Sequence, residues 1–245
     1  MAPARHLDGR FAEAERQFQA GLRLNPNYPI NHNWLYVLRL AQGSLDLGLL
    51  AAEKVTELDP LWAINLASQA EILFLVGRHA EALQLVDRVV ALRPDGLMIN
   101  LGNRARILAA LGRQDEAIAT ARMIGKDFQK SPRRDADVSA IWVLRQAGLQ
   151  AEAATYVENY FKVLPEQSPQ RGFVFGALGR FEEALPFLEK AATVTRRRLF
   201  WDAMWDPYRD DPRFQQLLVK LGCTEEYKVA RETLARMLKE QAAKK

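Results

Sequence analysis

The chain has 245 residues, of which 49% are hydrophobic and 26% charged, so it can bury a sizeable core and does not belong to the disordered class. Its 34 Lys and Arg residues exceed its 30 Asp and Glu residues by only four, which does not by itself indicate a nucleic-acid-binding protein. The single cysteine, Cys223, excludes an intramolecular disulfide, and no segment has the roughly 18 apolar residues of a membrane span. We therefore expect a soluble, cytoplasmic protein without a membrane partner.

A glycine recurs along the chain with a period near 34 residues. Its positions are Gly9, Gly43, Gly77, Gly112, Gly148 and Gly179, with spacings of 34, 34, 35, 36 and 31. A small residue follows five positions after each glycine, at Ala14, Gly48, Ala82, Ala117, Ala153 and Ala184. A proline follows 17 positions after four of the glycines, at Pro26, Pro60, Pro94 and Pro165. A period of this length indicates repeats of one supersecondary unit.

Each recurring position has a mechanical role in a pair of helices. A glycine ends the first helix, because a left-handed backbone is unstrained without a Cβ. A small residue lies where the second helix crosses the first, since a larger side chain would force the helices apart. A proline after the second helix stops that helix from continuing. The pattern therefore predicts an all-α fold.

The predicted elements follow in chain order. Gly9 comes so early that most of the first helix of its pair would precede Met1, so we expect that the chain was cut from a longer protein or lost a helix. Complete pairs are predicted at about 28–42 with 44–58, 61–76 with 78–92, 95–111 with 113–128, 132–147 with 149–164, and 168–178 with 180–195. A capping residue followed by proline predicts helix starts at Ser131-Pro132, Ser168-Pro169, Asp206-Pro207 and Asp211-Pro212.

A last helix is predicted from about Thr224, its capping residue, to Ala243. Its apolar residues form one stripe, and the remainder of its surface is charged. The stripe consists of Tyr227, Ala230, Leu234 and Met237 with Leu238. We expect this helix to cover the last repeat, because the end of a stack of repeats needs a cap with a polar outer face.

Several segments resemble the tetratricopeptide repeat. They are Gly-Arg-Phe-Ala-Glu-Ala at 9–14, Gly-Arg-His-Ala-Glu-Ala-Leu at 77–83, Gly-Arg-Gln-Asp-Glu-Ala-Ile at 112–118, Gly-Arg-Phe-Glu-Glu-Ala-Leu at 179–185, and Leu-x-Pro at 24–26, 58–60 and 92–94. The resemblance implies a right-handed α-solenoid over residues 1–195, followed by capping helices over 196–245. The repeats would be a partial one at 1–27 and further ones at about 28–60, 61–94, 95–131, 132–165 and 166–197.

The segment Asp-Pro-x-Arg-Asp-Asp-Pro-Arg-Phe-Gln-x-Leu-Leu at 206–218 resembles the end of repeat regions attached to bacterial signalling proteins. In that group the repeats follow a serine/threonine kinase, a nucleotide cyclase or a winged-helix regulator domain. The resemblance therefore implies a module of a larger bacterial signalling or regulatory protein.

The sequence contains no constellation of catalytic residues. His6, His32 and His79 are isolated from one another and from any metal-ligand pattern, and no Gly-x-Ser-x-Gly elbow is present. Three aspartates at 206, 210 and 211 could suggest a cation site, but helix capping explains two of them better. We expect no enzyme activity, cofactor, metal or small-molecule substrate.

The resemblance also implies a binding surface, because in this family the first helix of each pair lines the concave face at fixed offsets before the glycine. Nine residues at these offsets, which we call the first-helix strip, are Asn33, Val37, Leu40, Glu71, Phe74, Arg106, Trp142, Arg145 and Phe173. The strip mixes apolar residues that can anchor a peptide with charges that can set its register. It lacks the two-carboxylate clamp of chaperone-binding members, which disfavours a chaperone tail as ligand.

Three functions remain open from the sequence. The first is a non-enzymatic protein-protein interaction module that binds a partner peptide or protein along the first-helix strip. The second is a self-assembling scaffold, in which the truncated first repeat exposes Phe11, Ala14 and Phe18 to another copy. The third, a nucleic-acid-binding solenoid, rests only on a pI of about 9.2 and is the least favoured.

Overall fold

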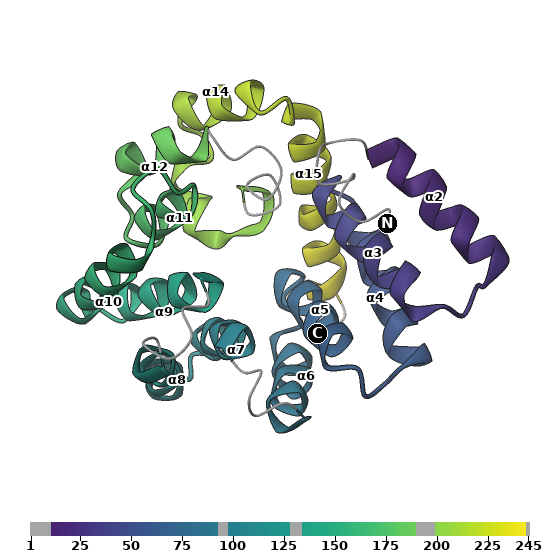
Figure 1. Cartoon of the computed structure of the whole chain (residues 1–245), viewed down its shortest axis with the longest axis horizontal. Coiled ribbons are helices and arrows are strands. Elements are labelled where there is room, and N and C mark those ends of the chain that lie inside the picture. The colour runs from purple at the N-terminus through teal and green to yellow at the C-terminus, as the bar shows by residue number, and fades with distance from the viewer. Residues whose placement is uncertain (1–10, 93–97, 128–133, 190–198, 244–245) are drawn as a thin grey trace. The chain divides into compact units, whose positions relative to one another are not determined.

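The structure is a computed structural model that describes residues 11–92, 98–127, 134–189 and 199–243 (Figure 1). These residues form helices and no strand. Three sequence features lie outside the described residues: the hinge glycine Gly9, the repeat proline Pro94 and the predicted helix start at Ser131-Pro132.

The five predicted helix pairs are confirmed, and most of the helices are a few residues shorter than expected. They are α3 (Pro29–Ala41) with α4 (Leu45–Leu58), α5 (Ala63–Leu75) with α6 (His79–Leu92), α7 (Met98–Ala110) with α8 (Gln114–Asp127), α9 (Arg134–Gln146) with α10 (Gln150–Val163), and α11 (Gln170–Ala177) with α12 (Phe181–Leu188). Helix α2 (Phe11–Leu24) precedes them, and η2 (Ala203–Tyr208), α14 (Pro212–Lys220) and α15 (Thr224–Ala242) follow.

Every described hinge glycine closes its first helix in the same way. Its φ lies between +74° and +79°, in the left-handed region that favours glycine. The residue after the glycine donates its backbone N–H to a carbonyl near the end of the first helix, as Ser44 does to Arg39 at 2.9 Å and Arg78 to Leu73 at 2.8 Å. This bond satisfies a carbonyl that the helix leaves open. The predicted role of the glycine is therefore confirmed.

The small residues after the hinge are buried, also as predicted. The five alanines are at most 3% exposed. In the second repeat, a Cβ on Gly48 would lie 2.7 Å from Leu40 Cδ1, so even an alanine would require the two helices to shift.

The helix starts predicted from capping residues followed by proline are only partly confirmed. Asp211 caps α14, because its Oδ1 accepts the backbone N–H of Arg213 at 2.9 Å. Asp206 is not a cap: it lies inside η2 and pairs with Arg209. Ser168 stands one residue too early to cap α11, and Thr224 is itself the first residue of α15. For Asp206 and Ser168 the helix therefore starts elsewhere than the dipeptide pattern indicates, whereas α15 begins at Thr224 as predicted, with Cys223 in the cap position.

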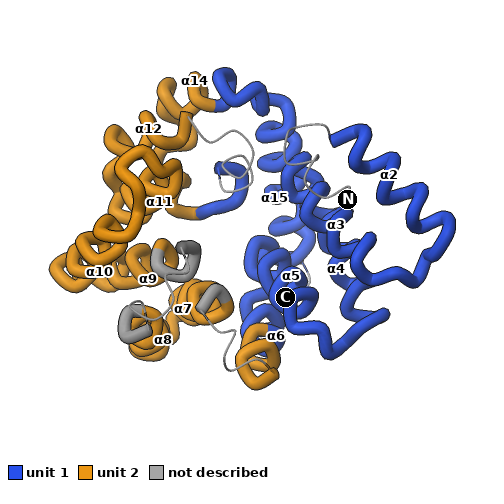
Figure 2. The backbone as a smooth tube through the Cα atoms, viewed as in Figure 1, with its two compact units in different colours: residues 1–85, 192–202, 218–245 blue, residues 86–191, 203–217 orange. Residues whose placement is uncertain are grey.

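The chain forms two compact units, which Figure 2 colours separately. Unit 1 comprises residues 1–85, 192–202 and 218–245. Within it, α2 packs on α3, and Phe11, Ala14 and Phe18 are buried in a cluster with Leu38 and Ala41. The expectation that these three α2 residues are exposed for another copy is therefore wrong, because α3 covers them.

The last helix, α15, also belongs to unit 1 and packs against α4. Its Ala230 is fully buried and Leu234 nearly so. Arg236 forms an ion pair of 2.6 Å with Asp46 at the start of α4. We expected α15 over the last repeat, and this expectation is corrected: its apolar stripe meets the second repeat instead.

Unit 2 comprises residues 86–191 and 203–217, and here the first part of the tail does cover the last repeat. Trp205 is fully buried, with edge contacts to Phe173 and Phe181 at centroid distances of 6.5 and 6.4 Å. Tyr208 stacks on Phe181 at 4.5 Å and donates its hydroxyl to the carbonyl of Gly179 at 2.6 Å. The segment from η2 to the first half of α14 is therefore the cap of this repeat.

The helix crossing in the fourth repeat makes a testable prediction. Ala117→Leu should destabilise the protein by about 1–3 kcal/mol, because the added atoms have no space in a packed crossing. Urea unfolding followed by circular dichroism measures this change. Ala119→Leu is the matched control, since Ala119 is exposed on the same helix, α8, and should change stability by no more than about 0.5 kcal/mol. Equal effects of the two substitutions would contradict the role of the small residue.

Candidate functional site

In unit 1 the first-helix strip lies on α3 and α5, which contact each other. The Ser68 hydroxyl of α5 donates to Asn33 Oδ1 on α3 at 3.4 Å. The Tyr36 hydroxyl of α3 donates to the Glu71 carboxylate on α5. These contacts hold the two helices in register and already use one oxygen of Glu71.

Two further strip residues of unit 1 have neighbours within the fold. The Phe74 ring lies 5.4 Å from the ring of His79, measured between centroids. Leu40 is 0% exposed, and its backbone carbonyl accepts the indole N–H of Trp201 at 3.1 Å. The Leu40 side chain therefore belongs to the core. Val37 and Phe74 keep part of their surface exposed.

In unit 2 the strip brings Arg106 of α7 and Trp142 of α9 together. The guanidinium carbon of Arg106 lies 6.0 Å from the centroid of the Trp142 ring, at the outer limit of a cation–π contact. The indole N–H of Trp142 is buried and makes no hydrogen bond within the described residues. A buried donor without a partner costs about 1–3 kcal/mol. An acceptor can reach this N–H only after a neighbouring side chain moves aside.

The two remaining strip residues of unit 2 contact the last repeat. Arg145 lies against the hinge of that repeat, since a Cβ on Gly179 would be 2.6 Å from its Nη2. Phe173 is only 4% exposed because Trp205 packs on it. Arg106, Trp142 and Arg145 therefore keep partly exposed side chains, whereas Phe173 belongs to the core.

The aromatic segment that contains Trp201 and Trp205 is the feature that sequence reasoning could not place. A signal was present in α11, which has glycines within the helix at 172 and 176. A Cβ on Gly172 would lie 3.0 Å from Leu188 Cδ2, and one on Gly176 would collide with the Trp205 ring. Glycine inside a helix disfavours the helix, so it indicates a close approach of another element.

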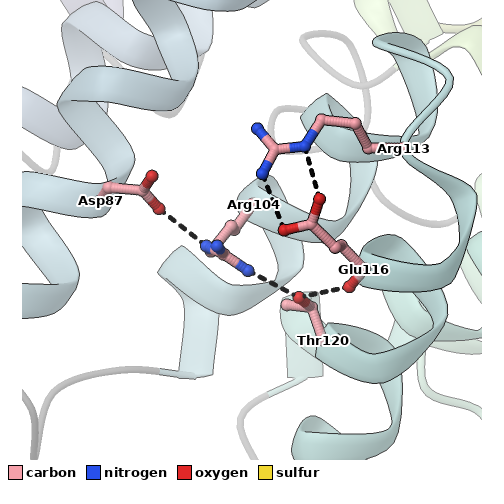
Figure 3. Close-up of polar contacts among 5 residues, drawn as sticks. All are labelled: Asp87, Arg104, Arg113, Glu116 and Thr120. Carbon is pink, nitrogen blue, oxygen red and sulfur yellow. Dashed lines mark hydrogen bonds and ion pairs between the residues drawn. The ribbon is translucent and has the colours of Figure 1, made fainter.

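Other arginines on the first helices of unit 2 are used within the fold. Arg171 of α11 donates to the carbonyls of Leu164 and Pro165 after α10, at 2.9 and 3.0 Å. Arg104 of α7 lies 2.7 Å from Asp87 of α6 and donates to the Thr120 hydroxyl of α8 at 2.9 Å. Figure 3 shows Arg104 between these two partners. Three successive helices are thus joined through one side chain.

The arginine after the hinge glycine has a constant partner, a glutamate three residues later. Arg113 forms two hydrogen bonds with Glu116, of 2.6 and 2.7 Å (Figure 3), and Arg78 forms the same pair with Glu81. Arg180 and Glu183 repeat it in the last pair. This spacing is visible in the sequence and indicates an ion pair at the start of the second helix.

These ion pairs lower the pKa values of carboxyl groups. Hydrogen bonds from Arg78, Arg113 and Arg122 hold the pKa values of Glu81, Glu116 and Glu152, respectively, below the ordinary value of 4.5. Arg122 and Glu152 also join α8 to α10, with two hydrogen bonds of 2.9 Å. All these side chains are at least partly exposed, so each pair contributes little on its own.

The lowered pKa values predict how stability depends on pH. Because these carboxyl groups hold protons less tightly when folded, the stability they contribute is fully present above their unfolded pKa of 4.5 and is lost as the pH falls below it through their lowered folded pKa values. Urea unfolding at low salt, measured across this range, should show a smaller loss in the triple variant Arg78→Gln, Arg113→Gln, Arg122→Gln. Lys162→Gln is the control, since Lys162 pairs with no carboxylate among the described residues and donates to Asn159 Oδ1. An unchanged pH slope in the triple variant would refute the assignment.

The aspartates of the 206–218 segment face arginines. Asp206 lies 2.6 Å from Arg209, and Asp211 lies 2.6 Å from Arg213. Among the described residues, no three of the types His, Cys, Asp and Glu gather as a metal site would require. Within the same part of the chain, no helix is both long and apolar enough to cross a membrane.

Comparison with known proteins bears on the fold. No family model matches the chain, and no curated protein matches it significantly. The crystal structure of MamA aligns with a TM-score of 0.51 at 19% identity, covering 66% of this chain and 93% of that chain. That of YrrB, described as a TPR protein with an unusual peptide-binding site, aligns with a TM-score of 0.46 at 14% identity, covering 88% and 96%. The helix pairs and the likeness to MamA confirm the predicted all-α fold of the tetratricopeptide-repeat type.

Proposed function

We propose that this chain is a non-enzymatic interaction module that binds a partner protein or peptide through residues of its first-helix strip, with Arg106 and Trp142 as the main contact residues of unit 2. The observation that carries the proposal is the arrangement of these two side chains. A cation lies over a partly exposed indole, and the indole N–H has no partner within the described residues. The guanidinium of Arg106 can donate hydrogen bonds to a ligand oxygen, whereas the buried Trp142 N–H can do so only once a neighbouring side chain moves aside.

The residue types support a protein partner. Trp and Arg are enriched among the few residues that carry most of the energy of protein interfaces. Trp provides a large rigid surface, and Arg provides a guanidinium that can form two parallel hydrogen bonds with one carboxylate. The strip residues of unit 2 include Arg106 and Arg145 and no carboxylate, although α9 also contains Asp135 and Asp137 near its start. The chemistry therefore favours a partner segment that carries an acidic residue beside an apolar one.

The strip of unit 1 supports a contact of different character. Val37 and Phe74 present partly exposed apolar surface, and the side-chain oxygens of Asn33 and Glu71 already accept hydrogen bonds from Ser68 and Tyr36. The apolar surface of Val37 and Phe74 suits an apolar side chain of the partner. Leu40 and Phe173 are left out of the proposed contact, because both are buried.

Peptide arrays test the proposal directly. The probes are 12-residue peptides with a central Leu or Phe, flanked by acidic, basic or uncharged residues. The acidic set should bind best, and Arg106→Gln or Trp142→Ala should each weaken that binding by about tenfold or more, as expected of a central interface residue. Fluorescence anisotropy on the best peptides gives the Kd values.

The control for lost charge is Lys162→Gln, on the exposed surface of the second helix α10, which should leave the Kd unchanged. Circular dichroism must show unchanged helicity in both test variants. If Arg106→Gln and Trp142→Ala both unfold the protein, the two residues are structural and the assignment of the binding surface is wrong. Equal binding of acidic and basic peptides would contradict the proposed preference for an acidic partner.

The resemblance of residues 206–218 to repeat regions of bacterial signalling proteins supports a place for this module in such a protein. The segment caps the last repeat of unit 2 through Trp205 and Tyr208, so its role in this chain is structural. The neighbouring coding sequence provides the test. A kinase, cyclase or winged-helix domain in the same polypeptide is expected. A metabolic enzyme domain there would contradict the proposal that the module belongs to a signalling protein.

A further inference from the structure

Helix α15 is seated on the hinges of two successive repeats in unit 1. A Cβ on Gly43 would collide with the backbone carbonyl of Glu226 and lie 3.1 Å from Ala230 Cβ. A Cβ on Gly77 would lie 3.3 Å from Leu238 Cδ2. The missing Cβ of each hinge glycine thus admits one end of the α15 interface. We call the surface around Gly43, Asp46 and Gly77 the hinge edge.

The hinge glycines at the hinge edge have close neighbours because α15 lies on them, and not because every hinge requires such a neighbour. Gly112 and Gly148 have the same left-handed backbone, with φ of +74° and +78°. A Cβ on either would have no neighbour within 4 Å. The fold therefore needs no helix at these positions, and the seat of α15 is a separate interaction.

The attachment of α15 is light for a helix of 19 residues. Only Ala230 and Leu234 are buried, while Val229 is 44% and Leu238 41% exposed. The ion pair between Arg236 and Asp46 is about half exposed, and such pairs stabilise weakly. Elements with few buried side chains open locally without global unfolding. Helix α15 is therefore able to leave the hinge edge while the repeats stay folded.

We propose that the hinge edge is a helix-binding site, that α15 occupies it reversibly, and that α15 of a second copy of this chain is its other occupant. A surface complementary to α15 within one chain is equally complementary to α15 of another, so exchange needs no new interface. The connection between α14 and α15 is short, from Leu221 to Cys223, with Gly222 at φ +59°. Short connections of this kind favour exchange between copies over refolding within one.

Release of α15 is tested first by hydrogen exchange on the full chain. Gly43→Ala should raise the exchange rates of α15 amides by at least about tenfold, because the added Cβ pushes the helix from its seat. Gly112→Ala is the matched control: it carries the same backbone strain but meets no neighbour, so α15 amides should keep the rates of the parent. Equal rates of α15 in both variants would overturn the proposed seat.

Exchange between copies is tested by reversing the ion pair. Asp46→Arg and Arg236→Asp each place like charges across the hinge edge in their own chain. In a mixture of the two variants, each helix finds an opposite charge only on the other chain. Sedimentation velocity over a concentration series should therefore show a larger dimer fraction in the mixture than in either variant alone.

The double variant Asp46→Arg with Arg236→Asp restores the pair within one chain and should behave as the parent. A mixture that stays monomeric at every concentration overturns the exchange. Dimers that form equally in each variant alone also overturn it, since they would use another surface. Circular dichroism confirms that every variant remains folded, so neither outcome can be attributed to misfolding.

Discussion

The left-handed glycine at the end of each first helix sets the geometry on which the other contacts depend. Its φ near +75° lets the next residue donate its backbone N–H to a carbonyl of the first helix. The second helix then starts within a few residues. The second helix then crosses the first so closely that only Ala or Gly fits five residues later. Because this geometry recurs, the ion pairs between Arg and Glu recur with it, as at Arg78 with Glu81 and Arg113 with Glu116.

A stack of helix pairs leaves apolar surface open at its ends, and the tail of this chain covers such surface in two places. In unit 2, Trp205 fills the space that Gly176 leaves on α11. In unit 1, Trp201 bonds to the carbonyl of Leu40, and α15 lies on α4. Different parts of the tail thus cover different repeats: Trp205 caps the last repeat, whereas Trp201 and α15 contact the second repeat. This division explains why the period of the repeats fails after residue 195.

Arginine plays three different roles on the first helices of unit 2, and the neighbouring acceptor decides which. Arg104 joins three helices through Asp87 and Thr120, and Arg171 satisfies carbonyls after α10. Arg106 lies over the Trp142 ring, as Arg171 also lies over the ring of Phe161. A modest net charge of +4 therefore conceals a local concentration of basic side chains without acidic residues on α7 and α11. The proposed preference for an acidic partner rests on this distribution and not on the total charge.

The sequence by itself determined the helix pairs, their hinges and their crossings, because each depends on residues fewer than 20 positions apart: the glycine, the small residue and the proline. It also indicated the offsets that bring Arg106 and Trp142 together. Only the tertiary structure decided which strip residues stay accessible. Phe173 is covered by Trp205, and the carbonyl of Leu40 bonds to Trp201 across 161 positions. Helix α15 likewise meets α4 across 190 positions, the separation of Arg236 from Asp46. Contacts at such separations leave no period in the sequence, since the partner of an apolar stripe is chosen by shape and burial in the folded chain.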